Sequence, residues 1–76
     1  MKKKVIEILC DYDGLTIADF GIKYQGALIT DVLLNDNGKI VFWSGNPFDD
    51  DYAEQILVDA NTEKLIYNEI IDNYGE

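Results

Sequence analysis

Residues 27–44, ALITDVLLNDNGKIVFWS, contain two apolar runs on either side of Asn37-Gly38. Asn-Gly suits the two central positions of a type I′ turn because both positions require a positive φ. We therefore predict an antiparallel hairpin with a two-residue loop. Its cross-strand pairs would be Asp36 with Lys39, Asn35 with Ile40, Leu34 with Val41, Leu33 with Phe42, and Val32 with Trp43.

The strand pleat sorts this hairpin into two faces, and both are apolar. The predicted core face carries Val32, Leu34, Val41 and Trp43, with Thr30 at its end. The opposite face carries Ile29, Leu33, Ile40 and Phe42 beside Asp31, Asn35 and Ser44. Leaving a large apolar side chain exposed forfeits about 1.5–3 kcal/mol of burial free energy. We therefore expect this second face to be covered, either by the C-terminal segment or by a partner. Ile29, Leu33, Ile40 and Phe42 are thus the candidate oligomer face, and a homodimer is the expected assembly.

The segments before the hairpin are read from composition and turn signals. Lys3–Cys10 is rich in Val, Ile and Leu and predicts a first strand, and Asp11–Gly14 predicts a turn. Leu15–Tyr24 is open between a strand broken at Gly21 and an irregular connection. After the hairpin, Ser44–Pro47 predicts a loop.

The C-terminal third allows two interpretations. As strands, Gln55–Ala60 and Lys64–Ile71 would flank the polar insert Asn61–Glu63 as a second hairpin. As a helix, residues 50–60 would follow an acidic first turn, with apolar residues at spacings of three, four and seven. The β-rich runs Ile56–Val58 and Leu65–Tyr67 favour the hairpin.

The length of 76 residues indicates one domain, residues 1–76, because so short a chain buries only about 60% of its surface in a single core. The predicted fold class is α+β and β-rich. We expect a small single-layer antiparallel sheet of about four to five strands built from hairpins. One short helix in the C-terminal half is the alternative to the second hairpin.

Charge is distributed unevenly along a chain whose net charge is −9. Residues 1–43 hold six acids and five lysines, whereas residues 44–76 hold nine acids and only Lys64. Binding to nucleic acid or to an anionic membrane requires clustered basic residues, so neither is expected. We expect a basic protein partner, with solubility as the alternative reason for the acidity.

Several classes of chemistry are disfavoured by what the sequence lacks. It contains no histidine and no arginine, so neither an imidazole base nor a bidentate phosphate clamp is available. The Asp-rich turns around Gly14 and Gly38 fail the ligand spacing of an EF-hand, and no Gly-rich phosphate loop is present. The single cysteine, Cys10, cannot form an internal disulfide and is expected to be buried. We expect no enzyme activity, no cofactor and no metal.

The chain lacks an apolar run of about 18 residues, which argues against a membrane span, and its lone cysteine fits the cytoplasm. Its size and acidity are similar to those of small inhibitors carried by phages and mobile elements against restriction and CRISPR nucleases. This similarity is one of composition only. The frequent Ile, Asn, Lys and Tyr residues are encoded by AT-rich codons, which suits a bacterium of low GC content or its phage.

The predicted function is therefore a non-enzymatic protein-binding module, an inhibitor or adaptor acting on a basic protein, which includes nucleic-acid-binding enzymes. The alternative is a self-associating structural module of a larger bacterial system. Aromatic residues next to charge are typical of interface anchors, and Trp43 begins such a run. The candidate partner-binding residues are Asp49, Asp50, Asp51, Tyr52 and Glu54.

Overall fold

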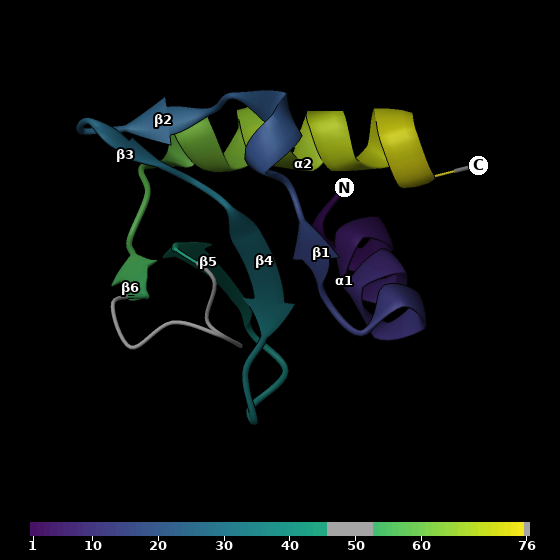
Figure 1. The fold of residues 1–76 in the computed structure, drawn as a ribbon. Coiled ribbons are helices and arrows are strands. Elements are labelled where there is room, and N and C mark those ends of the chain that lie inside the picture. The colour runs from purple at the N-terminus through teal and green to yellow at the C-terminus, as the bar shows by residue number, and fades with distance from the viewer. Residues whose placement is uncertain (46–52, 76) are drawn as a thin grey trace.

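The computed structural model describes residues 1–45 and 53–75. The elements in chain order are α1 (Lys2–Tyr12), β1 (Leu15–Thr16), a 3-10 turn η1 (Ala18–Phe20), β2 (Lys23–Tyr24), β3 (Ala27–Leu28), β4 (Asp31–Leu34), β5 (Ile40–Ser44), β6 (Glu54–Ile56) and α2 (Ala60–Tyr74). Four strands form an antiparallel sheet in the order β1-β4-β5-β6, and β2 and β3 form a separate hairpin (Figure 1). The predicted α+β class with a small antiparallel sheet is confirmed, and a two-stranded sheet accompanies the four-stranded one.

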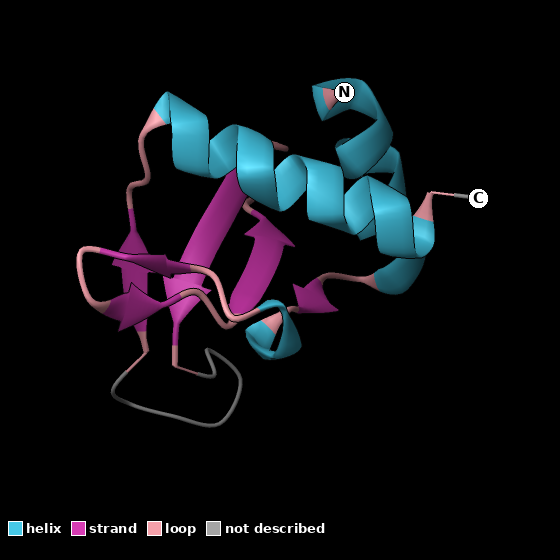
Figure 2. Ribbon diagram, turned by 90° about the horizontal axis from the view of Figure 1, so that it is seen from above, coloured by secondary structure: helices cyan, strands magenta, loops and turns pink. Residues whose placement is uncertain are grey.

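Both helices pack on one face of the sheet, and the core lies between them and the strands (Figure 2). The helices contribute Val5, Ile8 and Leu9 from α1 and Ile66, Tyr67 and Ile70 from α2. The sheet contributes Leu15, Val32 and Phe42, and the rings of Phe42 and Tyr67 lie 6.1 Å apart. The C-terminal segment therefore covers one face of the predicted hairpin.

The hairpin of β4 and β5 exists, but its predicted register is wrong by one residue. Leu34 pairs with Ile40, Leu33 with Val41 and Val32 with Phe42. The loop holds three residues instead of two, since Asn35 N–H donates to Lys39 O at 2.9 Å and Gly38 N–H to Asn35 O at 2.9 Å. Gly38 has φ 77° whereas Asn37 is not among the residues with positive φ, so the turn is not type I′.

The side chain of Asn35 explains this loop. Its Oδ1 accepts hydrogen bonds from the N–H groups of Asn37 at 2.9 Å and of Lys39 at 3.0 Å. Asn commonly makes such local bonds to the backbone two residues on, and here they stabilise the wider loop. A register change of one residue exchanges the partners of every side chain along the hairpin.

The predicted first strand over Lys3–Cys10 is wrong, because α1 spans these residues. Val5, Ile8 and Leu9 lie at spacings of three and four, which place them on one side of a helix. The helix ends where Asp13 has φ 56° and Gly14 has φ 95°, with Gly14 N–H donating to Leu9 O at 3.0 Å. Cys10 is exposed, which corrects the expectation that it is buried.

The ambiguous segment Leu15–Tyr24 is an irregular connection that contains β1, η1 and β2. The η1 turn ends at Gly21, which has φ 70°. Another hairpin lies before that of β4 and β5, where β2 and β3 meet at Gln25 and Gly26. Both residues have positive φ, at 51° and 83°, as the two centres of a type I′ turn require.

The predicted C-terminal hairpin is wrong over Lys64–Ile71, where α2 lies. Asp59 caps this helix, since its Oδ1 accepts from Thr62 N–H at 2.8 Å. The alternative helix over residues 50–60 is also wrong for its described part, because β6 occupies Glu54–Ile56.

Candidate functional site

The sheet face turned away from the helices carries an apolar strip, defined here as Leu33, Val41, Trp43 and Leu57. Leu33 pairs with Val41, and Trp43 pairs with Gln55 of β6. Leu33, Val41 and Trp43 are half-buried, while Leu57, just after β6, is 81% exposed. No helix of the described residues packs on this face, so no helical side chain covers the strip.

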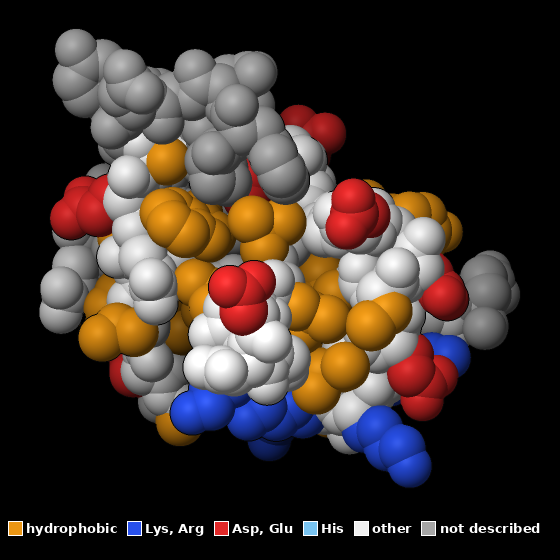
Figure 3. Space-filling view, turned by 90° about the horizontal axis from the view of Figure 1, so that it is seen from below, with side chains coloured by type: hydrophobic (Ala, Val, Ile, Leu, Met, Phe, Trp, Pro, Cys, Tyr) orange, Lys and Arg blue, Asp and Glu red, His pale blue; other side chains and the backbone are white. Residues whose placement is uncertain are grey.

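Figure 3 views the molecule from below, the side toward which the β4–β5 turn points in Figure 1. Hydrophobic side chains are exposed over much of this side, acidic side chains lie among them, and lysines gather along one edge. Such an apolar surface with charged neighbours is typical of a protein-binding site.

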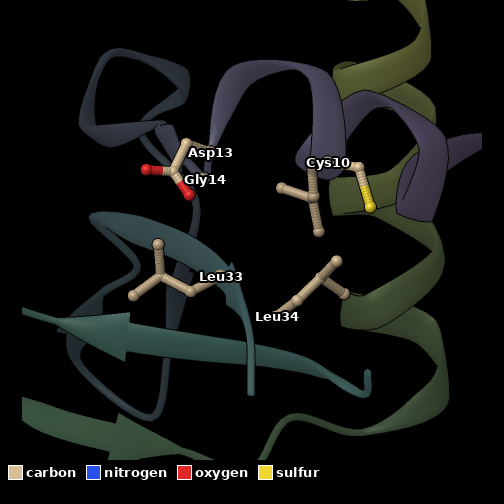
Figure 4. Close-up of a pocket in the computed structure, with 6 residues that line it drawn as sticks. Cys10, Asp13, Gly14, Leu33 and Leu34 are labelled. Atoms are coloured by element: carbon tan, nitrogen blue, oxygen red, sulfur yellow. The ribbon is translucent and has the colours of Figure 1, made fainter. Parts of the chain in front are cut away.

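Two of the hollows beside the strip share Leu33 and Leu34. One of about 160 Å³ is lined by Leu33, Leu34, Asn35, Val41, Trp43 and Gln55. A larger one of about 410 Å³ lies between the end of α1 and β4, lined by Leu9, Cys10, Asp13, Gly14, Leu33 and Leu34 (Figure 4). Since Leu33 and Leu34 line both hollows, the strip continues from the sheet face into the groove beside α1.

The groove exists because β1 is short. Its two residues pair only with Asp31 and Val32, so the following part of β4 has no strand beside it on that side. In Figure 4, Asp13 and Cys10 from the end of α1 face Leu33 and Leu34 across the hollow. The groove thus combines apolar walls with one carboxylate.

A buried polar cluster fixes the other end of the outer face. The carboxylate of Asp31, 3% exposed, accepts hydrogen bonds from Thr16 Oγ1 at 3.2 Å and Thr30 Oγ1 at 2.8 Å. The Thr30 hydroxyl also lies 2.8 Å from the carbonyl oxygen of Gly45, and Thr30 N–H donates to Trp43 O at 2.8 Å. Thr30 and Asp31 thus both oppose Trp43, as in a β-bulge. This cluster holds the ends of β1, β4 and β5 together and keeps Trp43 in place.

The predicted partner-binding residues are only partly covered by the structure. Asp49, Asp50, Asp51 and Tyr52 lie outside the described residues. Glu54 is exposed at the start of β6 and pairs with Ser44 of β5. It lies beside Gln55, the cross-strand partner of Trp43, so one predicted residue adjoins the apolar strip.

The predicted oligomer face of Ile29, Leu33, Ile40 and Phe42 is not one surface, and this corrects the prediction. Ile29 is fully buried, Phe42 is 5% exposed, and Ile40 packs against the same core. Leu33 lies on the other side of the sheet, paired with Val41. The cause is the one-residue change of register, which turns Phe42 toward the helices and Trp43 away from them.

Among the described residues two titratable groups are perturbed: Tyr67 lies in α2, and Asp59 caps that helix. Burial, the nearby Glu63 carboxylate and a hydrogen bond to that carboxylate raise the pKa of Tyr67 to about 12. The hydrogen bonds from Thr62 lower the pKa of Asp59 below its ordinary value. Both shifts are accounted for by helix contacts and neither group belongs to the apolar strip, so they point to no acid–base chemistry there.

Over residues 1–45 and 53–75 the fold brings together no group of three or more metal-binding side chains. Within the same ranges, neither helix has the length and hydropathy needed to cross a membrane.

Comparison with known proteins returned no matching family model, no matching curated protein and no matching solved structure.

Sequence reasoning missed most of the apolar strip. It placed Val41 and Trp43 on the core face, and it did not single out Leu57 or Gln55. The wider loop was signalled by Asn35, which precedes Asp36-Asn37-Gly38 and can bond to the turn backbone. With a three-residue loop, the sequence alone would have placed Trp43 on the sheet face turned away from Val32 and Leu34.

Proposed function

We propose that this chain is a non-enzymatic protein-binding module, an inhibitor or adaptor that docks its apolar strip onto a basic protein. The observation that carries the proposal is the strip itself, which holds Trp43 and the 81% exposed Leu57 on a sheet face where no helix of the described residues packs. Trp is among the residues most enriched at the energetic centres of interfaces. An apolar centre of this kind gives affinity once a partner excludes water from it.

Charge supports a basic partner. The chain carries −9, and acids adjoin the strip, among them Asp13, which lines the groove, and Glu54, which precedes Gln55 on β6. Complementary charge around an apolar centre raises the association rate and selects the partner. By the same argument a second copy of this chain is repelled, which disfavours the self-associating module.

The finer proposal is an inhibitor of a nucleic-acid-binding enzyme, of the anti-restriction or anti-CRISPR kind. It is supported by size and acidity, since a dense carboxylate surface can compete with phosphates for a basic groove. Such an inhibitor should displace a DNA duplex from its partner, whereas an adaptor that binds elsewhere should leave the DNA bound.

The test uses a purified partner obtained by cross-linking and mass spectrometry from a bacterial host, with Kd measured by calorimetry. Leu57→Ser should weaken binding about tenfold or more, because burying an exposed leucine contributes about 1.5–3 kcal/mol. Leu65→Ser is the matched control, since Leu65 is 50% exposed on α2, and it should change Kd less than about twofold. Equal effects of the two substitutions would refute docking through the strip.

Salt and aspartate substitution test the electrostatic part. Between about 0.05 and 0.5 M salt the Debye length falls from over 10 Å to below 5 Å, so partner affinity should fall. Replacing Asp49, Asp50 and Asp51 by Asn should weaken binding about tenfold, mainly through the association rate. If the aspartate variant instead loses thermal stability with unchanged binding, these acids are structural. A dimer mass at low salt in the absence of partner would favour the self-associating module.

A further inference from the structure

We propose that the free edge of β6 accepts an extended, basic segment of the partner, which would add a fifth strand to the sheet. This inference rests on the proposed function, because it names how the partner attaches beside the apolar strip. β6 is the last strand in the order β1-β4-β5-β6, and within the part of the chain that the structure describes β5 is its only neighbour in that sheet.

The backbone of Gln55 points toward this edge. Thr30 N–H donates to Trp43 O at 2.8 Å, so the backbone polar groups of Trp43 face β4. In an antiparallel pair, directly opposite residues either exchange both of their hydrogen bonds or exchange none. Gln55 is opposite Trp43 and exchanges none with it, so its N–H and C=O point away from β5. These are the groups that an added strand would pair with.

A cleft lies beside this edge. It has a volume of about 250 Å³ and is lined by Tyr24, Gln25 and Ala27 of the β2–β3 hairpin and by residues 54–57. Figure 1 shows β6 at the end of the sheet, with β2 and β3 above it. An added strand runs about 4.8 Å from its neighbour, and the cleft provides open space on that side.

The pleat determines what the added segment should look like. Gln55 shares the outer face with Trp43, so an incoming residue opposite Gln55 continues the apolar strip if it is apolar. The next incoming residue lies on the other face beside Glu54, where a lysine or arginine would be paired. The segment that fits is therefore one of alternating apolar and basic residues.

A second copy of this chain fits the edge poorly. Residues 53–75 contain five acids and only Lys64, so two such edges would repel each other. β6 is also only three residues long, which is too short for a stable interface between identical edges without further contacts. Charge complementarity thus favours a basic segment from another protein.

The experiment titrates the ¹⁵N-labelled full chain with an acetylated, amidated peptide of four Lys-Val repeats at up to about 1 mM, the affinity range of weak strand pairing. Gln55 N–H should be protected from hydrogen exchange at least about tenfold on binding, since it gains a partner only in the complex. The amides of Glu54 and Ile56, already bonded to β5, should change less than about twofold. The matched peptide of Glu-Val repeats should have no effect.

A backbone variant supplies the second arm. Gln55→Pro deletes the outward N–H and leaves the bonds between β5 and β6 intact, as proline permits on an edge strand. Gln55→Ala keeps the N–H and removes the side chain. The peptide should bind the alanine variant normally and the proline variant at least about tenfold more weakly.

The outcomes separate this inference from the proposed function. If the Lys-Val peptide leaves the exchange of Gln55 N–H unchanged, or if the proline and alanine variants bind alike, strand addition is refuted. The proposed docking then stands or falls on Leu57→Ser with the purified partner, which does not depend on the backbone of Gln55. If Leu57→Ser leaves partner binding unchanged while the Lys-Val peptide protects Gln55 N–H, strand addition at β6 stands and docking through the apolar strip is refuted.

Discussion

Replacing Gly14 by alanine should destabilise the protein by about 2–3 kcal/mol. Gly14 has φ 95°, and an L-residue with a positive φ costs about 1–2 kcal/mol. A Cβ at Gly14 would also meet Leu33 Cδ2 closer than two carbons can approach. Overpacking of this kind costs about 1–3 kcal/mol, and the lower end applies because the half-buried Leu33 can rotate away.

This loss is large for so short a chain, whose core should supply about 3–5 kcal/mol. Urea unfolding followed by the fluorescence of Trp43, the only tryptophan, gives the free energy of unfolding. Gly26→Ala is the control for the backbone, since Gly26 has φ 83° with no atom within 4 Å of the added Cβ. It should cost about 1–2 kcal/mol.

A double-mutant cycle isolates the close approach of Gly14 and Leu33. Leu33→Ala removes the contact, so the double variant should be less destabilised than the sum of the single variants by about 1 kcal/mol. Strictly additive costs, or a Gly14→Ala cost no larger than that of Gly26→Ala, would refute the packing of the α1 end against β4.

Four further substitutions test the turn and α2. Asn37→Ala should change the free energy of unfolding by less than about 0.5 kcal/mol and Gly38→Ala by about 1–2 kcal/mol, because of these two turn residues only Gly38 has a positive φ. A type I′ turn would penalise both substitutions. The pKa of Asp59 is lowered, so its carboxylate stabilises the folded protein above the ordinary pKa of 3.8, and this stabilisation is lost as pH falls through the lower pKa of the folded state. An acid titration of the Asp59→Ala variant should therefore lack this loss of stability. Tyr67 has a raised pKa of about 12, so stability should fall as pH rises from about 10 to about 12, and Tyr67→Phe should remove that fall in alkaline urea unfolding.

The hairpin was predictable from sequence because its signals are local. Two apolar runs around a Gly-containing turn indicate paired strands whatever the rest of the chain does. The register was not predictable from Asn37-Gly38 alone, because the Asn35 side chain stabilises a loop one residue wider. The positive-φ pair expected there occurs at Gln25-Gly26, a dipeptide with a weaker turn preference.

The N-terminal helix could not be assigned from its own residues. Val5-Ile6-Glu7-Ile8-Leu9 is apolar at nearly every position, so it satisfies helical and strand spacing alike. Its helical form buries Val5, Ile8 and Leu9 in a core that also contains residues of α2 and the sheet. Tertiary packing therefore decides between the two forms, and it is not visible in a short window.

The C-terminal helix carried a signal that sequence analysis overlooked. Asp59 three residues before Thr62 matches an N-cap, and Ile66, Tyr67 and Ile70 follow at helical spacing. The β-branched content of Ile56–Val58 and Leu65–Tyr67 outweighed that signal, although β propensity mostly reflects packing. Of the candidate site, the acidity could be read from the sequence and Trp43 could be named as a candidate anchor, whereas the position of Trp43 on the sheet face away from the core depended on the register.

A hairpin with two apolar faces needs two covers, and residues 1–45 and 53–75 supply one. The helices bury Val32 and Phe42, while Val41 and Trp43 stay on the outer face. An apolar outer face would promote self-association in a neutral protein, but a net charge of −9 repels like copies and attracts basic surfaces. Salt should therefore weaken the binding of a basic partner and relieve the repulsion between copies of this chain. On this view acidity and exposed apolar surface work together, since the charge keeps the face available for a partner of opposite sign.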